Sequence, residues 1–185
     1  MKYKIVTIIF IVVLIFILVG IKPLGRCFYT LKYNGFIAKY STEYSLDPYL
    51  VASLIKAESN FNSNAKSQKN AFGLMQITDE TGRWAAKEMK IDNFNTELLY
   101  DPEFNIKMGC WYLKNLKTEF NGNMDVVLAA YNGGRGNVQK WLSSKDHSAD
   151  GLNLYYIPFK ETDKYVKKVN ANYKIYKFLY VSILK

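Results

Sequence analysis

The sequence predicts an all-α protein: a single helical domain over about residues 28–185, preceded by one N-terminal transmembrane helix. Asp47 and Asp101 each stand directly before a proline, the arrangement in which aspartate caps a helix and proline occupies its first turn. Apolar residues then recur at helical spacing, and no stretch alternates convincingly as a strand would. These observations together favour helices throughout.

The N-terminal segment is expected to be a membrane anchor. Lys2 and Lys4 precede Ile5–Ile21, in which Thr7 is the only clearly polar residue. A helix of that length spans about 26 Å, against about 30 Å for a hydrocarbon core. The apolar part of a signal peptide is shorter, about 7–15 residues, and ends at small residues. We therefore expect residues 1–27 to form a cytoplasmic stub and an uncleaved single-pass anchor; a cleaved signal, which would leave the domain secreted, is the alternative.

The helical elements are expected in a definite order. The segment 28–39 is a connector or a first helix, and the Asn-, Ser- and Lys-rich stretch 60–70 is a loop. The remaining helices are expected to start at Asp47-Pro48, to run from a Thr78 cap to about Lys90, to run from Asp101-Pro102 to about Phe120, and to cover Met124–Asn132, Val138–Leu142 and a long segment from Pro158 to about residue 180.

Composition excludes several classes of site. His147 is the only histidine, and Cys27 and Cys110 are far apart, so neither a zinc centre nor a disulfide framework is expected. Whether the two cysteines pair stays open. The formal net charge of +9 suits an anionic partner, but no compact Lys/Arg block of the nucleic-acid-binding type occurs. We expect no metal, no cofactor and no nucleic acid.

Glu58 is the sharpest candidate for chemistry. It lies one turn after Leu54 and Ile55, on the apolar stripe of its helix and near the C-terminal end. Burial and the negative helix end both disfavour the carboxylate, so both should raise its pKa toward that of a general acid. The alternative is a helix-end glutamate that faces solvent or pairs with Lys56 or Lys66.

Two short motifs complete the candidates. In Gly73-Leu74-Met75-Gln76 the glycine permits a close backbone approach or a positive φ, and Gln76 offers a donor and acceptors to an acetamido or hydroxyl group. A turn leading into a helix explains this tetrapeptide equally well. The glycine cluster after Asn132 lacks the Gly-Lys-Ser/Thr ending and the preceding strand of a phosphate loop.

Taken together, these residues resemble the soluble lytic transglycosylase (SLT domain) family over about residues 38–180. The order of the motifs carries the resemblance: Glu58-Ser59, Ser67, Gly73-Leu74-Met75-Gln76, Ala130-Tyr131-Asn132, and Glu161-Thr162 with Tyr165-Val166. The sequence departs from the family pattern at Gly133, where an alanine is usual.

The resemblance implies a lysozyme-like fold with a peptidoglycan groove and no cofactor. Glu58 would be the sole catalytic carboxylate. The other positions would serve as follows: Ser67 orients Glu58 or the substrate, Gln76, Tyr131 and Asn132 line the groove, Tyr165 faces Glu58, and Glu161, Gly73 and Met75 are supporting residues.

The implied activity is that of a lytic transglycosylase, which cleaves the β-1,4 bond from N-acetylmuramic acid to N-acetylglucosamine and leaves a 1,6-anhydro product. A hydrolytic muramidase on the same fold is the first alternative; it needs a second carboxylate, for which Asp79 and Asp101 are conceivable. A non-catalytic wall-binding component of an envelope-spanning machine is the second. Expected partners are peptidoglycan strands and, through the anchor, the cell membrane, with the domain outside the cytoplasm.

Overall fold

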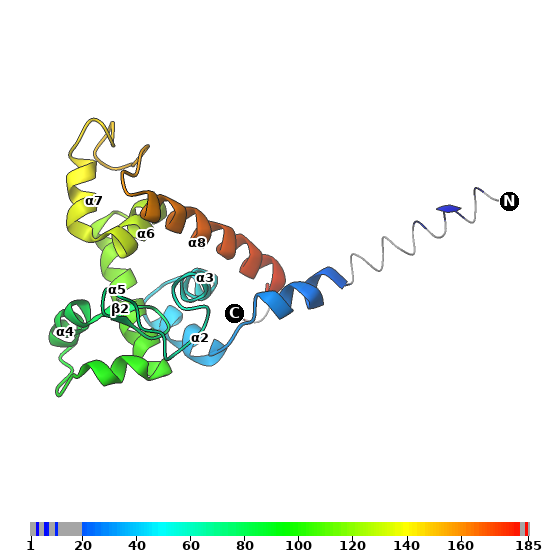
Figure 1. Cartoon of the computed structure of the whole chain (residues 1–185), viewed down its shortest axis with the longest axis horizontal. Coiled ribbons are helices and arrows are strands. Elements are labelled where there is room, and N and C mark those ends of the chain that lie inside the picture. The colour runs from blue at the N-terminus through cyan, green and yellow to red at the C-terminus, as the bar shows by residue number, and fades with distance from the viewer. Residues whose placement is uncertain (1–2, 4–5, 8–9, 11–19, 182–183, 185) are drawn as a thin grey trace.

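Most of the computed structural model is helical, and several of its helices begin at a capping side chain; Figure 1 shows how the helices are arranged. The structure describes residues 3, 6–7, 10, 20–181 and 184. The named helices are α2 (Asn34–Glu43), α3 (Pro48–Glu58), α4 (Asp79–Glu88), the 3-10 helix η1 (Thr96–Tyr100), α5 (Pro102–Glu119), α6 (Met124–Gly133), α7 (Arg135–Leu142) and α8 (Lys160–Leu179). Among the described residues, the chain is therefore mostly helical, as predicted.

The expected caps are present. The Asp47 carboxylate accepts from the backbone N–H of Tyr49 at 2.8 Å, and that of Asp101 from Phe104 at 2.7 Å. The Thr78 hydroxyl accepts from a backbone N–H in the first turn of α4. Each cap satisfies a donor that would otherwise lack a partner at the helix start.

The expectation of no strand was wrong over one short stretch. Ala71–Phe72 (β1) and Ile77–Thr78 (β2) form an antiparallel pair with Phe72 opposite Ile77. Two residues per strand are too few for alternation to stand out in a sequence. The tetrapeptide Gly73–Gln76 is therefore the turn of a hairpin and does not lead directly into a helix.

α3 and α8 pack side by side, and this pair positions the candidate site (Figure 1). α3 is buried from Tyr49 to Ile55, and α8 buries Val166, Val169 and Tyr176. The Asn172 side chain in α8 donates to the backbone carbonyl of Ser53 in α3 at 3.3 Å. The two helices thus pack along a largely apolar interface, with the last residue of α3 next to the first turns of α8.

The expected anchor falls largely outside the described residues. Of Ile5–Ile21, the structure describes only Val6, Thr7, Phe10, Gly20 and Ile21. Within the described part of the chain, no helix combines the length and the apolar character needed to cross a membrane. Residues 20–28 are helical, and a second helix, α2, follows, so the predicted connector 28–39 lies across the break between two helices.

Candidate active site

Glu58 and Tyr165 meet where α3 ends and α8 begins. Glu58 is the last residue of α3, and its Oε1 accepts a hydrogen bond from the Tyr165 hydroxyl at 2.7 Å. Beside it, the Lys168 ammonium donates to the backbone carbonyl of Ala57 at 2.8 Å. The proposed pairing of Glu58 with Lys56 is not what the structure holds, because Lys56 donates to Asn60 instead.

The surroundings of Glu58 make its proton easy to give and to take near neutrality. Burial raises the pKa of Glu58 to about 7, against the opposing effects of the Tyr165 hydrogen bond and the Lys168 charge. The carboxylate of Glu161 adds a small further increase in that pKa. The direction agrees with the one predicted from the position of Glu58 in its helix, and burial is the dominant cause.

Tyr165 remains a hydrogen-bond donor throughout this range. Burial, with the nearby Glu58 charge second, raises the pKa of Tyr165 well above its usual value. A neutral phenol therefore faces Glu58 in both protonation states of the carboxyl group. It stabilises the charged form more, because hydrogen bonds to ionised groups are stronger.

Glu58 opens into a cleft of about 400 Å³. Most of the side chains around it are polar, as suits a sugar ligand. The lining residues are Glu58, Ser67, Gln68, Lys69, Ala71, Gln76, Thr78, Tyr131, Asn132 and Glu161. The structure thus brings the predicted positions from the 60–70 loop, the hairpin, α6 and α8 around one carboxylate.

The hairpin turn holds its shape through two backbone features. Gly73 has φ 73°, and a Cβ there would lie 2.1 Å from the Leu99 carbonyl oxygen, so only glycine fits. Gln76 also has a positive φ, 49°, and its amide nitrogen donates to the carbonyls of Ala65 and Gly73 at 3.2 and 3.0 Å. The Gln76 side chain therefore braces the turn while it lines the cleft.

Asn105, which the sequence analysis did not single out, ties this turn to α5. Its side chain is fully buried; the Oδ1 atom accepts from the Met75 N–H at 2.8 Å. Its Nδ2 donates to the carbonyls of Phe72 and Leu99 at 3.0 and 2.8 Å. The sequence signal that could have identified Asn105 was its position three residues before Met108, which places it on the buried face of α5.

Met75 connects the hairpin to α5, through Gly109, and to α6, through Tyr131. The Met75 side chain packs on Gly109 so closely that a Cβ at Gly109 would lie 2.3 Å from the sulfur. The backbone carbonyl of Met75 accepts from the Tyr131 hydroxyl at 2.8 Å. Burial raises the pKa of Tyr131 well above its usual value, so this donor is permanent.

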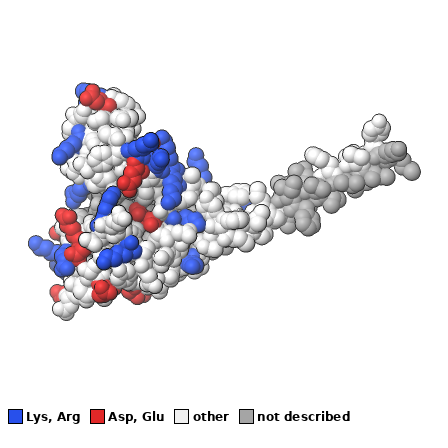
Figure 2. Space-filling model, in the orientation of Figure 1, with Lys and Arg blue, Asp and Glu red and all other residues white. Residues whose placement is uncertain are grey.

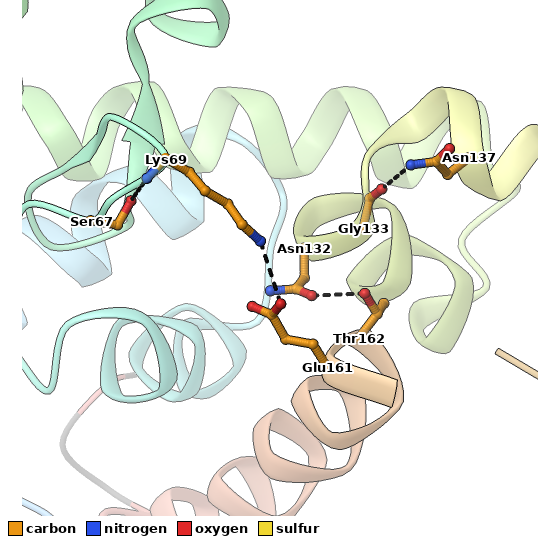
Figure 3. A network of polar contacts seen from close by, with 7 residues as sticks. All are labelled: Ser67, Lys69, Asn132, Gly133, Asn137, Glu161 and Thr162. Atoms are coloured by element: carbon orange, nitrogen blue, oxygen red, sulfur yellow. Dashed lines mark hydrogen bonds and ion pairs between the residues drawn. The ribbon is translucent and has the colours of Figure 1, made fainter. Parts of the chain in front are cut away.

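Figure 3 shows a polar network that includes four residues of the cleft lining, Ser67, Lys69, Asn132 and Glu161. The Ser67 hydroxyl accepts from the backbone N–H groups of Lys69 and Ala71, each at 3.2 Å, and so fixes its own loop. Lys69 reaches across to the Glu161 carboxylate at 3.4 Å, with both side chains largely exposed. This ion pair links the loop to the start of α8.

Gly133, the departure from the family pattern, lies against the same network. Thr162 donates to the Asn132 side chain at 2.9 Å, which holds Asn132 at the cleft edge. A Cβ at Gly133 would lie 3.0 Å from the Thr162 hydroxyl oxygen and 3.2 Å from the Trp141 ring. The glycine thus allows α8 to start close to the end of α6.

The two other aspartates considered as second carboxylates lie elsewhere. Asp79 is paired with Arg83 at 2.8 Å and also bonds Thr96, and Asp101 caps α5. Neither lines the cleft. Within the described residues, no group of three or more His, Cys, Asp and Glu side chains is placed to hold a metal ion.

Comparison with known proteins gives consistent matches. A family model described as the transglycosylase SLT domain matches residues 35–153. The soluble lytic murein transglycosylase of Escherichia coli K12 is 33% identical over 152 residues, which are 81% of this chain and 24% of that protein.

Two solved structures share the fold. The crystal structure of the 70 kDa soluble lytic transglycosylase from Escherichia coli matches 86% of this chain and 26% of its own, with a TM-score of 0.76 and 29% identity. An inactive glutamate-to-glutamine mutant of the lytic transglycosylase Slt from Pseudomonas aeruginosa matches 81% of this chain and 24% of its own, with a TM-score of 0.71 and 29% identity. This chain spans about a quarter of the length of these relatives.

Proposed function

The chain belongs to the transglycosylase SLT family, and from that premise we propose that it is a peptidoglycan lytic transglycosylase. Its substrate would be the β-1,4 glycosidic bond that joins N-acetylmuramic acid to N-acetylglucosamine. The observation that carries the proposal is the pair formed by Glu58 and Tyr165, in which a carboxyl group with a pKa of about 7 faces a polar cleft.

In the first half of the reaction Glu58 acts as the acid. Its protonated form donates to the glycosidic oxygen while the bond from that oxygen to the anomeric carbon of the muramic sugar breaks. A pKa near the working pH serves a group that must give a proton and then take one back. Tyr165, by donating to Oε1, stabilises the carboxylate that is left.

In the second half the same carboxylate acts as the base. It takes the proton of the C6 hydroxyl of the muramic sugar, whose oxygen forms a new bond to the anomeric carbon. The product is a 1,6-anhydro ring, no water is consumed, and Glu58 regains its proton. An internal nucleophile is favoured because it is already held beside the carbon that it attacks.

The other cleft residues would hold the sugars. Asn132 carries an amide at the cleft surface, and Gln76, whose amide nitrogen bonds its own turn, would offer its carbonyl oxygen; both match acetamido groups and hydroxyls. Ser67 and Tyr131 would shape the walls, since their hydroxyl groups bond the protein backbone. Glu161 would be a supporting residue, held at the edge by Lys69.

A hydrolytic muramidase remains the alternative that product analysis separates. An inverting enzyme needs a second carboxylate about 6.5–9.5 Å from the first to activate water. Asp79 and Asp101 are engaged outside the cleft, which leaves Glu161 as the remaining acidic residue lining it. Mass analysis of the soluble muropeptides decides, because the anhydro product lacks one water.

Glu58→Gln tests the proposal as a whole. The substitution keeps the shape and removes the titrating proton, so both halves of the reaction should fail, and a single acid or base contributes about 10²–10⁴-fold. The Pseudomonas aeruginosa relative is likewise inactive as a glutamate-to-glutamine mutant. Glu161→Gln, the comparison variant, should retain anhydro product. A folded Glu58→Gln protein with most of the parent activity would refute the assignment; a parent without turnover would favour the wall-binding alternative.

We also propose that the chain is held at the cell membrane by Ile5–Ile21, with the helical domain outside the cytoplasm, where peptidoglycan lies. The length and apolar character of that segment support retention. Fractionation followed by N-terminal sequencing is the test. Protein recovered free in the medium with a new N-terminus near Cys27 would mean that the segment is a cleaved signal.

A further inference from the structure

Two segments from opposite ends of the chain carry no acidic residue. The first acid is Glu43 and the last is Asp163, so residues 1–42 and 164–185 contain none of the 16 Asp and Glu. Each of these segments contains six of the 25 Lys and Arg. Lys2 and Lys4 precede the expected anchor and belong to its cytoplasmic stub, so a partner outside the cytoplasm would meet the positive charge of the other basic residues of both segments, with no acidic residue among them.

The fold joins the two segments into one unit. The Arg26 guanidinium donates to the backbone carbonyl of Leu179 at 2.7 Å. The hydroxyl of Tyr180 donates to the carbonyl of Tyr29 at 2.7 Å. Gly25 fits against the Leu179 side chain so closely that a Cβ there would lie 2.8 Å from it. The helical stretch 20–28 and the residue that follows it are thus held against the end of α8 by hydrogen bonds and close packing.

Large apolar residues on this joined unit are exposed to solvent, each over 49% to 69% of its surface. They alternate with cations, and Lys22 lies over the Phe178 ring at 5.1 Å. We name this surface the collar and define it by its apolar members Ile21, Leu24, Phe28, Phe178 and Val181 and its basic members Lys22, Arg26, Lys174 and Lys177. In Figure 2 the narrow part of the molecule next to the grey N-terminal atoms, here called the neck, is mostly white and shows no red acidic residue.

We propose that the collar rests on the surface of an anionic phospholipid bilayer. Its composition is that of an interfacial surface, in which apolar side chains enter the headgroup region and Lys and Arg bind lipid phosphates. The collar begins where Ile5–Ile21 ends, so the expected anchor delivers it to the membrane. The proposal rests on the membrane placement given above and adds a second, separate contact.

The consequence is a fixed placement of the cleft. α8 carries Tyr165 near one end and Phe178, 13 residues further along the helix, near the other, a rise of about 20 Å. Figure 1 shows α8 running from α6, beside the site, to the neck. With the collar on the bilayer, α8 acts as a spacer that holds Glu58 off the membrane, so glycan strands at that height are the ones presented to it.

The test uses the full chain in nanodiscs of phosphatidylglycerol and phosphatidylcholine. Cys27, the exposed thiol, is replaced by serine, and Cys110 is buried. An environment-sensitive fluorophore is then placed on Phe178→Cys, on Val181→Cys or on Ser143→Cys, which directly follows α7. Quenching is measured with lipids brominated near the headgroup. We expect loss of fluorescence at the two collar positions and none at 143.

Charge variants separate docking from simple tethering. Lys174→Glu should reduce quenching at 178, and so should discs made of phosphatidylcholine alone. Lys140→Glu, an exposed lysine on α7, is the matched control and should leave quenching unchanged. Protein that elutes with the discs but shows no more quenching at 178 and 181 than at 143 overturns the collar.

The same samples report on the proposals beneath it. A chain that fails to enter the discs refutes the membrane placement and the collar together. If the parent protein shows normal quenching but releases no anhydro product from purified peptidoglycan, the proposed activity is refuted and the collar proposal stands. Quenching at 178 in phosphatidylcholine equal to that in the anionic mixture refutes the role given to the basic residues.

Discussion

Tyr165→Phe should move the pH dependence of catalysis upward by about one unit. The substitution removes the hydroxyl that donates to Glu58 at 2.7 Å and leaves the ring. That bond lowers the pKa of Glu58, whose value is about 7 with the bond present. A hydrogen bond to an ion exceeds one to a neutral group by about 1–1.5 kcal/mol, and 1.36 kcal/mol is one pKa unit.

The sign follows from the proposed role of Glu58 as the acid. The free enzyme must hold the proton, so kcat/KM is lost as the pH rises through the pKa of Glu58. The parent should lose activity around pH 7 and the variant around pH 8, both read as release of anhydro muropeptides from purified peptidoglycan. The maximal rate of the variant should also fall, because Glu58 loses the group that orients it.

Tyr173→Phe is the matched control. Tyr173 lies on the same helix, and its hydroxyl donates to a carboxylate, that of Asp47, at the same 2.7 Å, away from the cleft. Its pH profile should match that of the parent. An alkaline limb that stays in place in Tyr165→Phe, or moves to lower pH, would show that this contact does not control the proton on Glu58.

Three further predictions concern stability, each measured by thermal or urea unfolding. Gly73→Ala should lose more than about 2 kcal/mol, since a Cβ would meet the Leu99 carbonyl at 2.1 Å in a backbone with φ 73°; a fall below half that value would contradict the close approach. Asn105→Ala should lose about 3 kcal/mol or more, because three buried backbone groups lose their partner; a near-neutral effect would mean that water replaces the amide. Burial raises the pKa of Glu58 from 4.5 to about 7, so ionising it costs the folded state up to about 3 kcal/mol above pH 7 and nothing below pH 4.5. Glu58→Gln should therefore melt higher than the parent at about pH 8 and close to it at about pH 4.5; an equal difference at both would refute the buried, protonated state.

Where a signal is local, the sequence was sufficient. Asp47, Thr78 and Asp101 cap the helices that they were expected to start, because a cap and its donor lie two or three residues apart. Boundaries set by packing were less accurate: α4 ends at Glu88, before the expected Lys90, and α7 begins at Arg135, before the expected Val138. Among the apolar residues that recur at helical spacing in α5, Met108 and Leu116 are buried, while Phe104, Trp111 and Tyr112 are only half-buried.

The order of motifs in the sequence predicted which residues line the candidate site. Its place on an apolar stripe made Glu58 a candidate, and the resemblance that the motifs carry implied its catalytic role. What each residue touches was decided by tertiary structure alone. Tyr165 bonds Glu58, which lies 107 residues away in the sequence. The Gln76 amide nitrogen bonds the carbonyl of Gly73 in its own turn, and Asn105 in α5 bonds the same turn. The physical reason is distance along the chain. Helix propensity and capping act within a few residues, whereas the burial that raises the pKa of Glu58 exists only once α3 and α8 have packed together.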